Sequence, residues 1–168
     1  MSSWAALLRA VNVGGNNGLP MAELRALCEG LGLERVKTHI ASGNVVFASK
    51  RSEAELRLAI EAALFERYAK HLGVLVRSAA DLAEVVAASP WPGRPGNRVV
   101  AIFIDGELSL DGMTGQRSET VELGSRAIYV DYLEGMADTR LRIPAAKLGT
   151  ARNMNTVAKL AAMTAALG

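Results

Sequence analysis

Arg9 and the glycine- and asparagine-rich segment after it are the first residues of this sequence that could do chemistry. Arg9 lies inside an apolar run, and residues 12–18 read Asn-Val-Gly-Gly-Asn-Asn-Gly. A glycine-rich loop between a strand and a helix lets backbone N–H groups approach an anion, and the helix start adds a partial positive charge. The segment is neither a Walker A loop nor a GxGxxG loop. It predicts an anion site formed by Arg9, Asn12, Gly14 and Gly15. A structural ion pair of Arg9 is the alternative.

A second candidate lies near the C-terminus, where residues 149–156 read Gly-Thr-Ala-Arg-Asn-Met-Asn-Thr. Thr150 is a typical N-cap residue, so we expect a helix to begin there with Arg152 and Asn153 in its first turn. A cation in that turn opposes the helix dipole, and asparagine is a poor helix former. An arginine beside free helical N–H groups suits a phosphate or a carboxylate. The segment predicts ligand binding by Arg152, Asn153 and Asn155, with a capping network as the alternative.

The third candidate is the tripeptide Ser42-Gly43-Asn44, which lies between two β-type runs. A Gly-Asn pair in this setting indicates a hairpin turn. Taken alone it is only a turn. Ser42 and Asn44 become binding residues if the fold brings them close to the other two segments.

The other reactive residue types form no catalytic pattern. His39 and His71 are isolated, the acidic residues are scattered, and no HExxH, CxxC or GxSxG spacing occurs. The one cysteine, Cys28, lies on the apolar stripe of an expected helix, which favours a buried core thiol over a nucleophile. The sequence therefore nominates no metal site, no cofactor and no nucleophile–base pair. It favours a binding protein over an enzyme.

Four strings of this sequence, in this order and spacing, resemble one protein family. They are residues 8–15 (LRAVNVGG), 19–24 (LPMAEL), 42–47 (SGNVVF) and 150–156 (TARNMNT). Over essentially its whole length the chain resembles the mainly bacterial domain-of-unknown-function family 1697 (DUF1697). The resemblance implies an α+β protein built of two ferredoxin-like halves. It also implies that the three polar segments are family signatures, and it supplies no activity, substrate or cofactor.

Two positions depart from the pattern of that family. Met154 stands where the family typically has tryptophan, and His39 stands where it often has tyrosine. If the tryptophan of relatives stacks on a ligand, this chain binds that ligand differently. If the tryptophan only packs, methionine is a tolerable filler.

The elements expected in residues 1–78 follow the order strand, helix, strand, strand, helix, strand. This order is the split βαβ, or ferredoxin-like, arrangement, which gives one four-stranded antiparallel sheet with two helices on one face. Ser52 and Glu55 form a capping box at the start of the second helix. The expected strands are residues 4–11, 36–41, 45–48 and 74–77, and the expected helices are residues 21–31 and 52–70.

The elements expected in residues 79–168 again mix strands and helices, so we predict a second α+β half of related topology, although no sequence repeat is visible. Residues 89–96 (SPWPGRPG) are the only linker-like stretch. The other expectations are helices at 79–88, within 137–148 (interrupted by Pro144) and from 150 to 167, strands at 98–104, 120–123 and 127–132, and an irregular or weakly helical stretch at 105–115.

Composition places the 168-residue chain among globular proteins. No run of 18 apolar residues occurs, so we expect no membrane span, and Met1-Ser2-Ser3-Trp4 is unlike a secretory signal. A single cysteine fits a reduced, cytoplasmic setting. After the last acidic residue, Asp138, come five cationic residues and no anionic one. Such a basic segment is either an anion-binding feature or a solvated face.

We therefore expect the three polar segments to gather into one positively charged pocket. It would bind a phosphate- or carboxylate-bearing ligand, such as a nucleotide, without a metal. Two alternatives remain open. One is an enzyme acting on a phosphorylated metabolite, although the sequence identifies no residue as a general base. The other is a structural or nucleic-acid-associated protein that uses the basic C-terminal segment, although the expected sheet lacks a pair of stacking aromatics.

Overall fold

The computed structural model describes residues 1–9, 19–39 and 43–167. By its internal contacts the chain divides into two compact units. Unit 1 comprises Met1–Asp81 and Leu160–Gly168, and unit 2 comprises Leu82–Lys159. The boundary expected above, between residues 78 and 79, was drawn from the order of the elements in the sequence. As domains, residues 1–78 and 79–168 stay a prediction.

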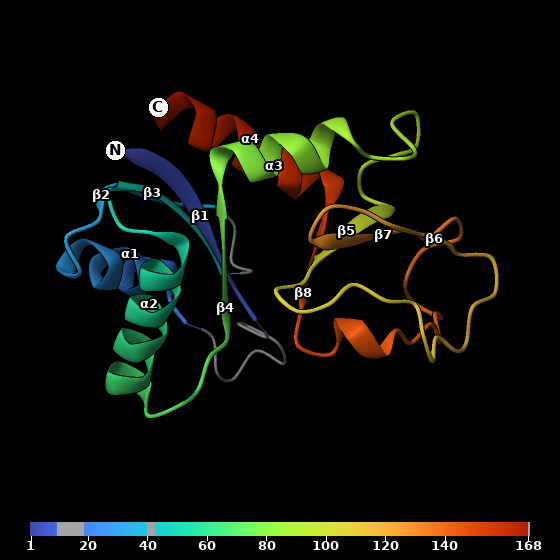
Figure 1. Ribbon diagram of the computed structural model, residues 1–168, viewed down its shortest axis with the longest axis horizontal. Coiled ribbons are helices and arrows are strands. Elements are labelled where there is room, and N and C mark those ends of the chain that lie inside the picture. The colour runs from blue at the N-terminus through green and yellow to red at the C-terminus, as the bar shows by residue number, and fades with distance from the viewer. Residues whose placement is uncertain (10–18, 40–42, 168) are drawn as a thin grey trace. The chain divides into compact units, whose positions relative to one another are not determined.

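Unit 1 contains the first four strands and first two helices of the chain (Figure 1). The strands pair antiparallel in the order β2-β3-β1-β4, here called sheet A. This order confirms the ferredoxin-like arrangement expected from the sequence. The elements are β1 (Ser2–Leu8), α1 (Met21–Gly30), β2 (Glu34–His39), β3 (Asn44–Ser49), α2 (Glu53–Tyr68) and β4 (Val74–Ser78). The first strand thus ends at Leu8, three residues before the expected end.

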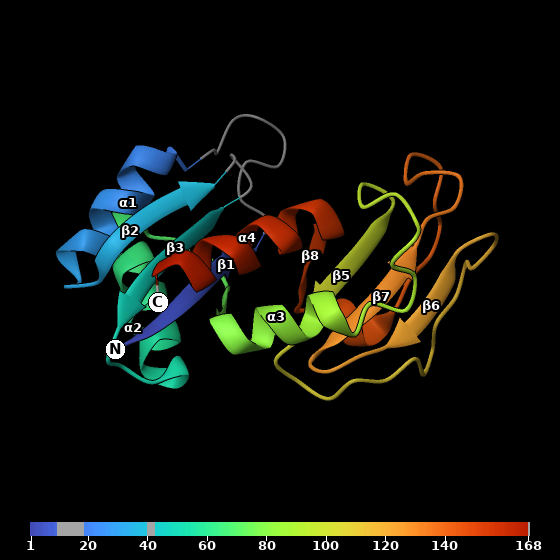
Figure 2. The same ribbon diagram turned by 90° about the horizontal axis from the view of Figure 1, so that it is seen from above.

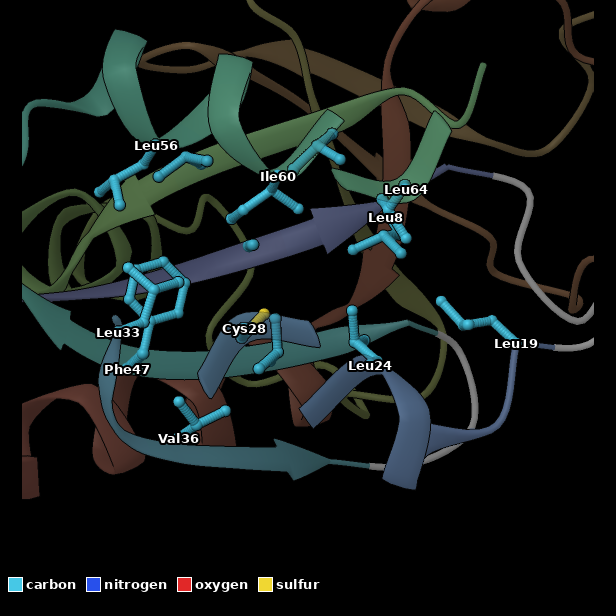
Figure 3. Close-up of a cluster of buried hydrophobic side chains, with 14 residues drawn as sticks. Leu8, Leu19, Leu24, Cys28, Leu33, Val36, Phe47, Leu56, Ile60 and Leu64 are labelled. Atoms are coloured by element: carbon cyan, nitrogen blue, oxygen red, sulfur yellow. The ribbon is translucent and has the colours of Figure 1, made fainter. Parts of the chain in front are cut away.

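The core of unit 1 lies between sheet A and the two helices α1 and α2 (Figure 3). Side chains alternate along a strand, so one face of β1 and β3 supplies Leu8 and Phe47 to this core. The helices supply apolar residues at helical spacing, among them Leu24, Cys28 and Ile60, all fully buried. Cys28 is therefore the core thiol that its position predicted.

Unit 2 contains the other four strands, which pair antiparallel in the order β6-β7-β5-β8, here called sheet B (Figure 2). In chain order this is the same arrangement as in sheet A, so the expected relation between the two halves is confirmed. The elements are α3 (Ala79–Ala87, which begins in unit 1), β5 (Val99–Phe103), β6 (Thr120–Leu123), β7 (Ala127–Asp131), a 3₁₀ turn (Pro144–Ala146), β8 (Thr150–Asn153) and α4 (Met154–Leu167, which ends in unit 1).

The connections after β5 and β7 are irregular in unit 2, whereas the corresponding connections in unit 1 contain helices. The helix expected within residues 137–148 is wrong, because only Pro144–Ala146 form a short 3₁₀ turn. Glycines with positive φ at Gly112, Gly115 and Gly135 favour turns over a helix. Apolar side chains of these connections, such as Leu108 and Leu141, pack on sheet B in place of helices.

The last strand, β8, occupies residues that we expected to begin a helix. Thr150 and Arg152 are buried, Ala151 between them is exposed, and the four residues pair with β5. The helix expected from Thr150 instead begins at Met154, as α4. The placement of Arg152 and Asn153 in a first helical turn is therefore wrong.

Candidate functional site

Arg9 lies at the carboxyl end of β1, where three segments of unit 1 meet. Its backbone N–H donates to the carbonyl of Gly73, at 2.9 Å, just before β4 begins. The N–H of Leu8 donates to the carbonyl of Gly43, also at 2.9 Å, just before β3 begins. Arg9 and the Gly43–Asn44 turn therefore share one end of sheet A.

Gly73 leaves room for the side chain of Arg9. A Cβ at Gly73 would lie 2.8 Å from Cδ of Arg9 and 3.3 Å from its Nη1. Real Cβ atoms do not approach so closely, so any larger residue at Gly73 would displace the arginine side chain. Arg9 itself is half-buried. A glycine therefore helps to set the position of the first candidate cation.

Asn44 is fully buried at the start of β3. Its side-chain amide donates to the carbonyl of His39 at 3.1 Å, which ties together the two ends of the connection between β2 and β3. Asn44 pairs with Leu7 of β1, two residues before Arg9. The structure thus brings Arg9 and Asn44 to one end of the sheet, while Asn12, Gly14, Gly15 and Ser42 lie outside the described residues.

Arg152 belongs to unit 2, where it lies opposite Ala101 in the pairing of β5 and β8. Its Nη1 donates to the hydroxyl of Thr150 at 2.6 Å and to the carbonyl of Ala151 at 2.9 Å. Loss of water around the buried guanidinium lowers the pKa of Arg152 to about 10. These contacts hold the arginine along its own strand.

The start of α4 is capped by the protein itself. The N–H groups of Met154 and Asn155 donate to the carbonyl of Gly96, at 3.0 and 3.4 Å. The N–H of Thr156 donates to Oδ1 of Asn153 at 2.9 Å, so Asn153 acts as the N-cap residue. The free helical N–H groups that we expected beside Arg152 are therefore already engaged. Asn155 is exposed on the first turn.

The five cations of the basic C-terminal segment differ in burial. Arg152 is buried in β8, whereas Arg140, Arg142, Lys147 and Lys159 are exposed. The first three precede β8 in an irregular connection, and Lys159 lies on α4.

Among residues 1–9, 19–39 and 43–167, no group of three or more His, Cys, Asp or Glu side chains could hold a metal ion. Nor does any helix in this part of the chain have the length and apolar character needed to cross a bilayer.

A pocket in unit 2 was missed by the sequence analysis. It has a volume of about 280 Å³ and lies between the end of α3, the segment 89–96 and the first turn of α4. Trp91, Arg94 and Met154 contribute to its lining. The sequence signal was present, since a tryptophan and an arginine interrupt a stretch otherwise typical of a linker. We interpreted that stretch only as a connection.

Two four-stranded antiparallel sheets of the same strand order, in one α+β chain, define the structural class of this protein. The chain belongs to the family described as "Protein of unknown function (DUF1697)", whose model matches residues 1–129. Among solved structures it is similar to the conserved bacterial protein SP0830 from Streptococcus pneumoniae. The identity is 28%, the match covers 97% of this chain and 98% of that chain, and the TM-score is 0.80. A comparison with curated proteins found no match.

Proposed function

We propose that this protein is a metal-independent binding module for a small ligand that carries phosphate or carboxylate, such as a nucleotide. The site lies at the carboxyl end of β1, where Arg9 supplies the charge. Asn12, Gly14 and Gly15, which follow Arg9 in the sequence, would supply hydrogen-bond donors. Ser42 would contribute its hydroxyl, and Asn44 would hold the turn in place.

One observation carries this proposal: Arg9 and the Gly43–Asn44 turn, more than thirty residues apart in sequence, share one end of sheet A. Both were nominated from sequence as parts of polar signatures. A half-buried arginine whose position depends on a glycine, Gly73, is an arrangement that suits a ligand site more than a solvated face. Arginine also forms paired hydrogen bonds with carboxylate and phosphate groups.

The candidate residues of the C-terminal segment 149–156 support the proposal less directly. Arg152 donates hydrogen bonds within β8, to Thr150 and Ala151, and Asn153 caps the start of α4, which favours a structural role for both. Asn155 is exposed and lines the pocket of unit 2. Ligand binding by these three residues stays a prediction. We further propose a cytoplasmic location in a bacterial cell, in keeping with the single, buried cysteine.

Thermal unfolding in the presence of ligands tests the proposal. The panel contains inorganic phosphate, pyrophosphate, nucleotides, simple carboxylates and short oligonucleotides. A ligand at about 100 times its Kd stabilises the fold by about 2.7 kcal/mol, which for a chain of this size raises Tm by about 5–10 °C. We expect such a shift for one class of anion, lost in Arg9→Gln. Gly73→Ala, which keeps the charge but displaces the side chain, should reduce it.

The control is Arg25→Gln, because Arg25 is an exposed cation of α1 with only a 3.7 Å pair to Glu29. It should retain the full shift. The proposal is contradicted if no anion shifts Tm, or if Arg9→Gln and Arg25→Gln behave alike. An oligonucleotide that alone stabilises the protein, with an affinity falling steeply with salt, would favour nucleic-acid binding instead. Turnover of a phosphorylated metabolite would favour the enzyme.

A further inference from the structure

The pocket of unit 2 combines apolar walls with one oriented arginine. Trp91, Pro92, Met154 and the buried Val99 supply apolar surface, while Arg94 and Asn155 supply polar groups. Its volume of about 280 Å³ suits a ring system rather than a long chain. Tryptophan and methionine are both favourable neighbours of an aromatic ring.

A buried carboxylate orients Arg94. The Nε of Arg94 donates to Oδ2 of Asp131 at 3.0 Å, and the side chain of Asp131 is only 2% exposed, whereas that of Arg94 is 37% exposed. The side chain of Arg94 makes no other hydrogen bond or ion pair within the described part of the chain. With Nε engaged on the buried side, the two terminal nitrogens remain as a pair of adjacent donors.

The walls of the pocket are held in place by backbone contacts. Gly96 closes the segment that carries Trp91 and Arg94, and its carbonyl accepts the first two N–H groups of α4. A Cβ at Gly96 would lie 2.1 Å from Oδ1 of Asn155, so the segment and the helix approach as closely as a glycine permits. The helix start is thus occupied by protein, and recognition of a ligand falls to Arg94, Asn155 and the apolar walls.

The charge of the Arg94–Asp131 pair limits the class of ligand. The two charges compensate each other, so the pair can offer two directed donors without a net positive charge. A neutral, flat ring with two adjacent acceptors on one edge fits these donors better than a full anion does. The edge of a 6-oxopurine, with its O6 and N7 atoms, is such a group, and arginine reads it with two hydrogen bonds.

We propose that the pocket formed by Trp91, Arg94 and Met154 binds a 6-oxopurine base, with O6 and N7 facing the terminal nitrogens of Arg94. The ring lies against Trp91 and Met154, and the Asn155 side chain contacts its rim. This site belongs wholly to unit 2, so it does not depend on the anion site proposed at Arg9.

Isothermal titration of the full chain with nucleosides tests this proposal, because nucleosides carry no phosphate. We expect inosine and guanosine to bind, and adenosine and 7-deazaguanosine, which each lose one of the two acceptors, to bind at least about tenfold more weakly. A second readout locates the site. The chain has two tryptophans, so in a Trp4→Phe background Trp91 is the only one, and its fluorescence should change with inosine.

Arg94→Lys keeps the charge but loses the paired donors, so it should abolish the preference for inosine over adenosine. Arg126→Lys is the matched control, because Arg126 is also a partly exposed arginine paired to an aspartate, Asp105, and it does not line the pocket. It should keep the preference. The proposal is overturned if no nucleoside binds, or if inosine, adenosine and 7-deazaguanosine bind the native chain equally. Arg9→Gln should leave inosine binding unchanged, which separates this site from the anion site.

Discussion

Arg77 and Arg152 occupy equivalent positions in the two sheets. Arg77 lies in the edge strand β4 and pairs with Ala5 of β1, whereas Arg152 lies in the edge strand β8 and pairs with Ala101 of β5. Both arginines are buried, at 1% and 8% exposure. The Nη1 of each donates to the carbonyl of the residue before it, at 2.9 Å in both cases.

The equivalence continues into the helix that follows each arginine. The hydroxyl of Ser78 accepts the N–H of Asp81 at 3.0 Å, and Oδ1 of Asn153 accepts the N–H of Thr156 at 2.9 Å. Each arginine is thus followed by an N-cap residue whose side chain binds the N–H three residues on. The strand, the buried arginine, the cap and the helix form a structural repeat, although the two segments share little sequence beyond the arginine.

Truncation of either arginine should destabilise the protein to a similar degree. Arg77→Ala and Arg152→Ala each leave a cavity and remove a donor from a backbone carbonyl, so we expect the free energy of unfolding to fall by at least about 2 kcal/mol. Urea unfolding followed by circular dichroism measures the loss. Arg25→Ala, at an exposed site, should change the value by less than about 0.5 kcal/mol. If the free energy of unfolding is unchanged in either buried variant, the two arginines do not contribute similarly to stability.

Cys28 should be inert in the native protein. It is fully buried in the core of unit 1, and burial raises the pKa of its thiol to about 12, so the reactive thiolate is scarce at neutral pH. We expect no reaction with a thiol reagent at pH 7.5 within the time that a free cysteine needs for complete labelling. Full labelling should appear in denaturing urea. Rapid labelling without denaturant would mean that α1 opens readily from sheet A.

Residues 1–78 were predictable from sequence because their signals are local. The apolar spacing around Leu24 and Cys28 defines one helix, and Ser52 with Glu55 marks the start of another. The apolar run Val45–Ala48 marks β3, the strand that follows the Gly43–Asn44 pair. With these elements in order, few topologies remain, and the connection rules select the ferredoxin-like sheet.

The end of unit 2 was not predictable in the same way. The inward-facing residues of β8 are Thr150 and Arg152, so the strand lacks the alternation of apolar residues that identifies a half-buried strand. Thr150 is also a residue type that is common at helix N-caps, whereas the N-cap residue of α4 is Asn153. The pocket of unit 2 was not predictable for a similar reason. Arg94 and Asp131 are 37 residues apart in sequence, and no local sequence pattern predicts such a contact.

The capping box of α2 should contribute stability that depends on pH. The N–H of Glu55 donates to the hydroxyl of Ser52, and the carboxylate of Glu55 accepts the N–H of Ser52, both at 3.2 Å. Ser52→Ala should lower the free energy of unfolding at pH 7 by about 1 kcal/mol. Thermal unfolding of both proteins at matched pH values measures the difference.

The hydrogen bond from the Ser52 side chain is the main cause that lowers the pKa of Glu55 below its usual 4.5. A carboxyl whose pKa is lowered on folding stabilises the fold above its ordinary value and loses that contribution as the pH falls through its folded pKa. The Tm difference between the native protein and Ser52→Ala should therefore be largest above pH 4.5 and shrink in more acidic solution. A difference that grows on acidification would contradict this assignment.

Gly115 should be the least replaceable glycine in the irregular connections of unit 2. Its φ is +74°, and a Cβ there would lie 1.9 Å from the carbonyl oxygen of Arg140, a backbone atom that cannot swing away. The neighbouring residues Thr114 and Arg142 exchange two backbone hydrogen bonds, at 3.0 and 2.8 Å, which hold the two connections together. Gly115→Ala should therefore lower the free energy of unfolding by at least about 2 kcal/mol, through strain and steric overlap.

The matched control for this substitution is Gly106→Ala. Gly106 lies in the same connection between β5 and β6, has no positive φ, and has nothing within 4 Å of the added Cβ. The free energy of unfolding of Gly106→Ala should lie within about 0.5 kcal/mol of that of the native protein. For a chain of this size, Gly115→Ala should lower Tm by about 4–8 °C in a calorimetric scan, whereas Gly106→Ala should leave Tm nearly unchanged. Equal melting temperatures for the two variants would mean that the connections shift to accept a side chain at Gly115.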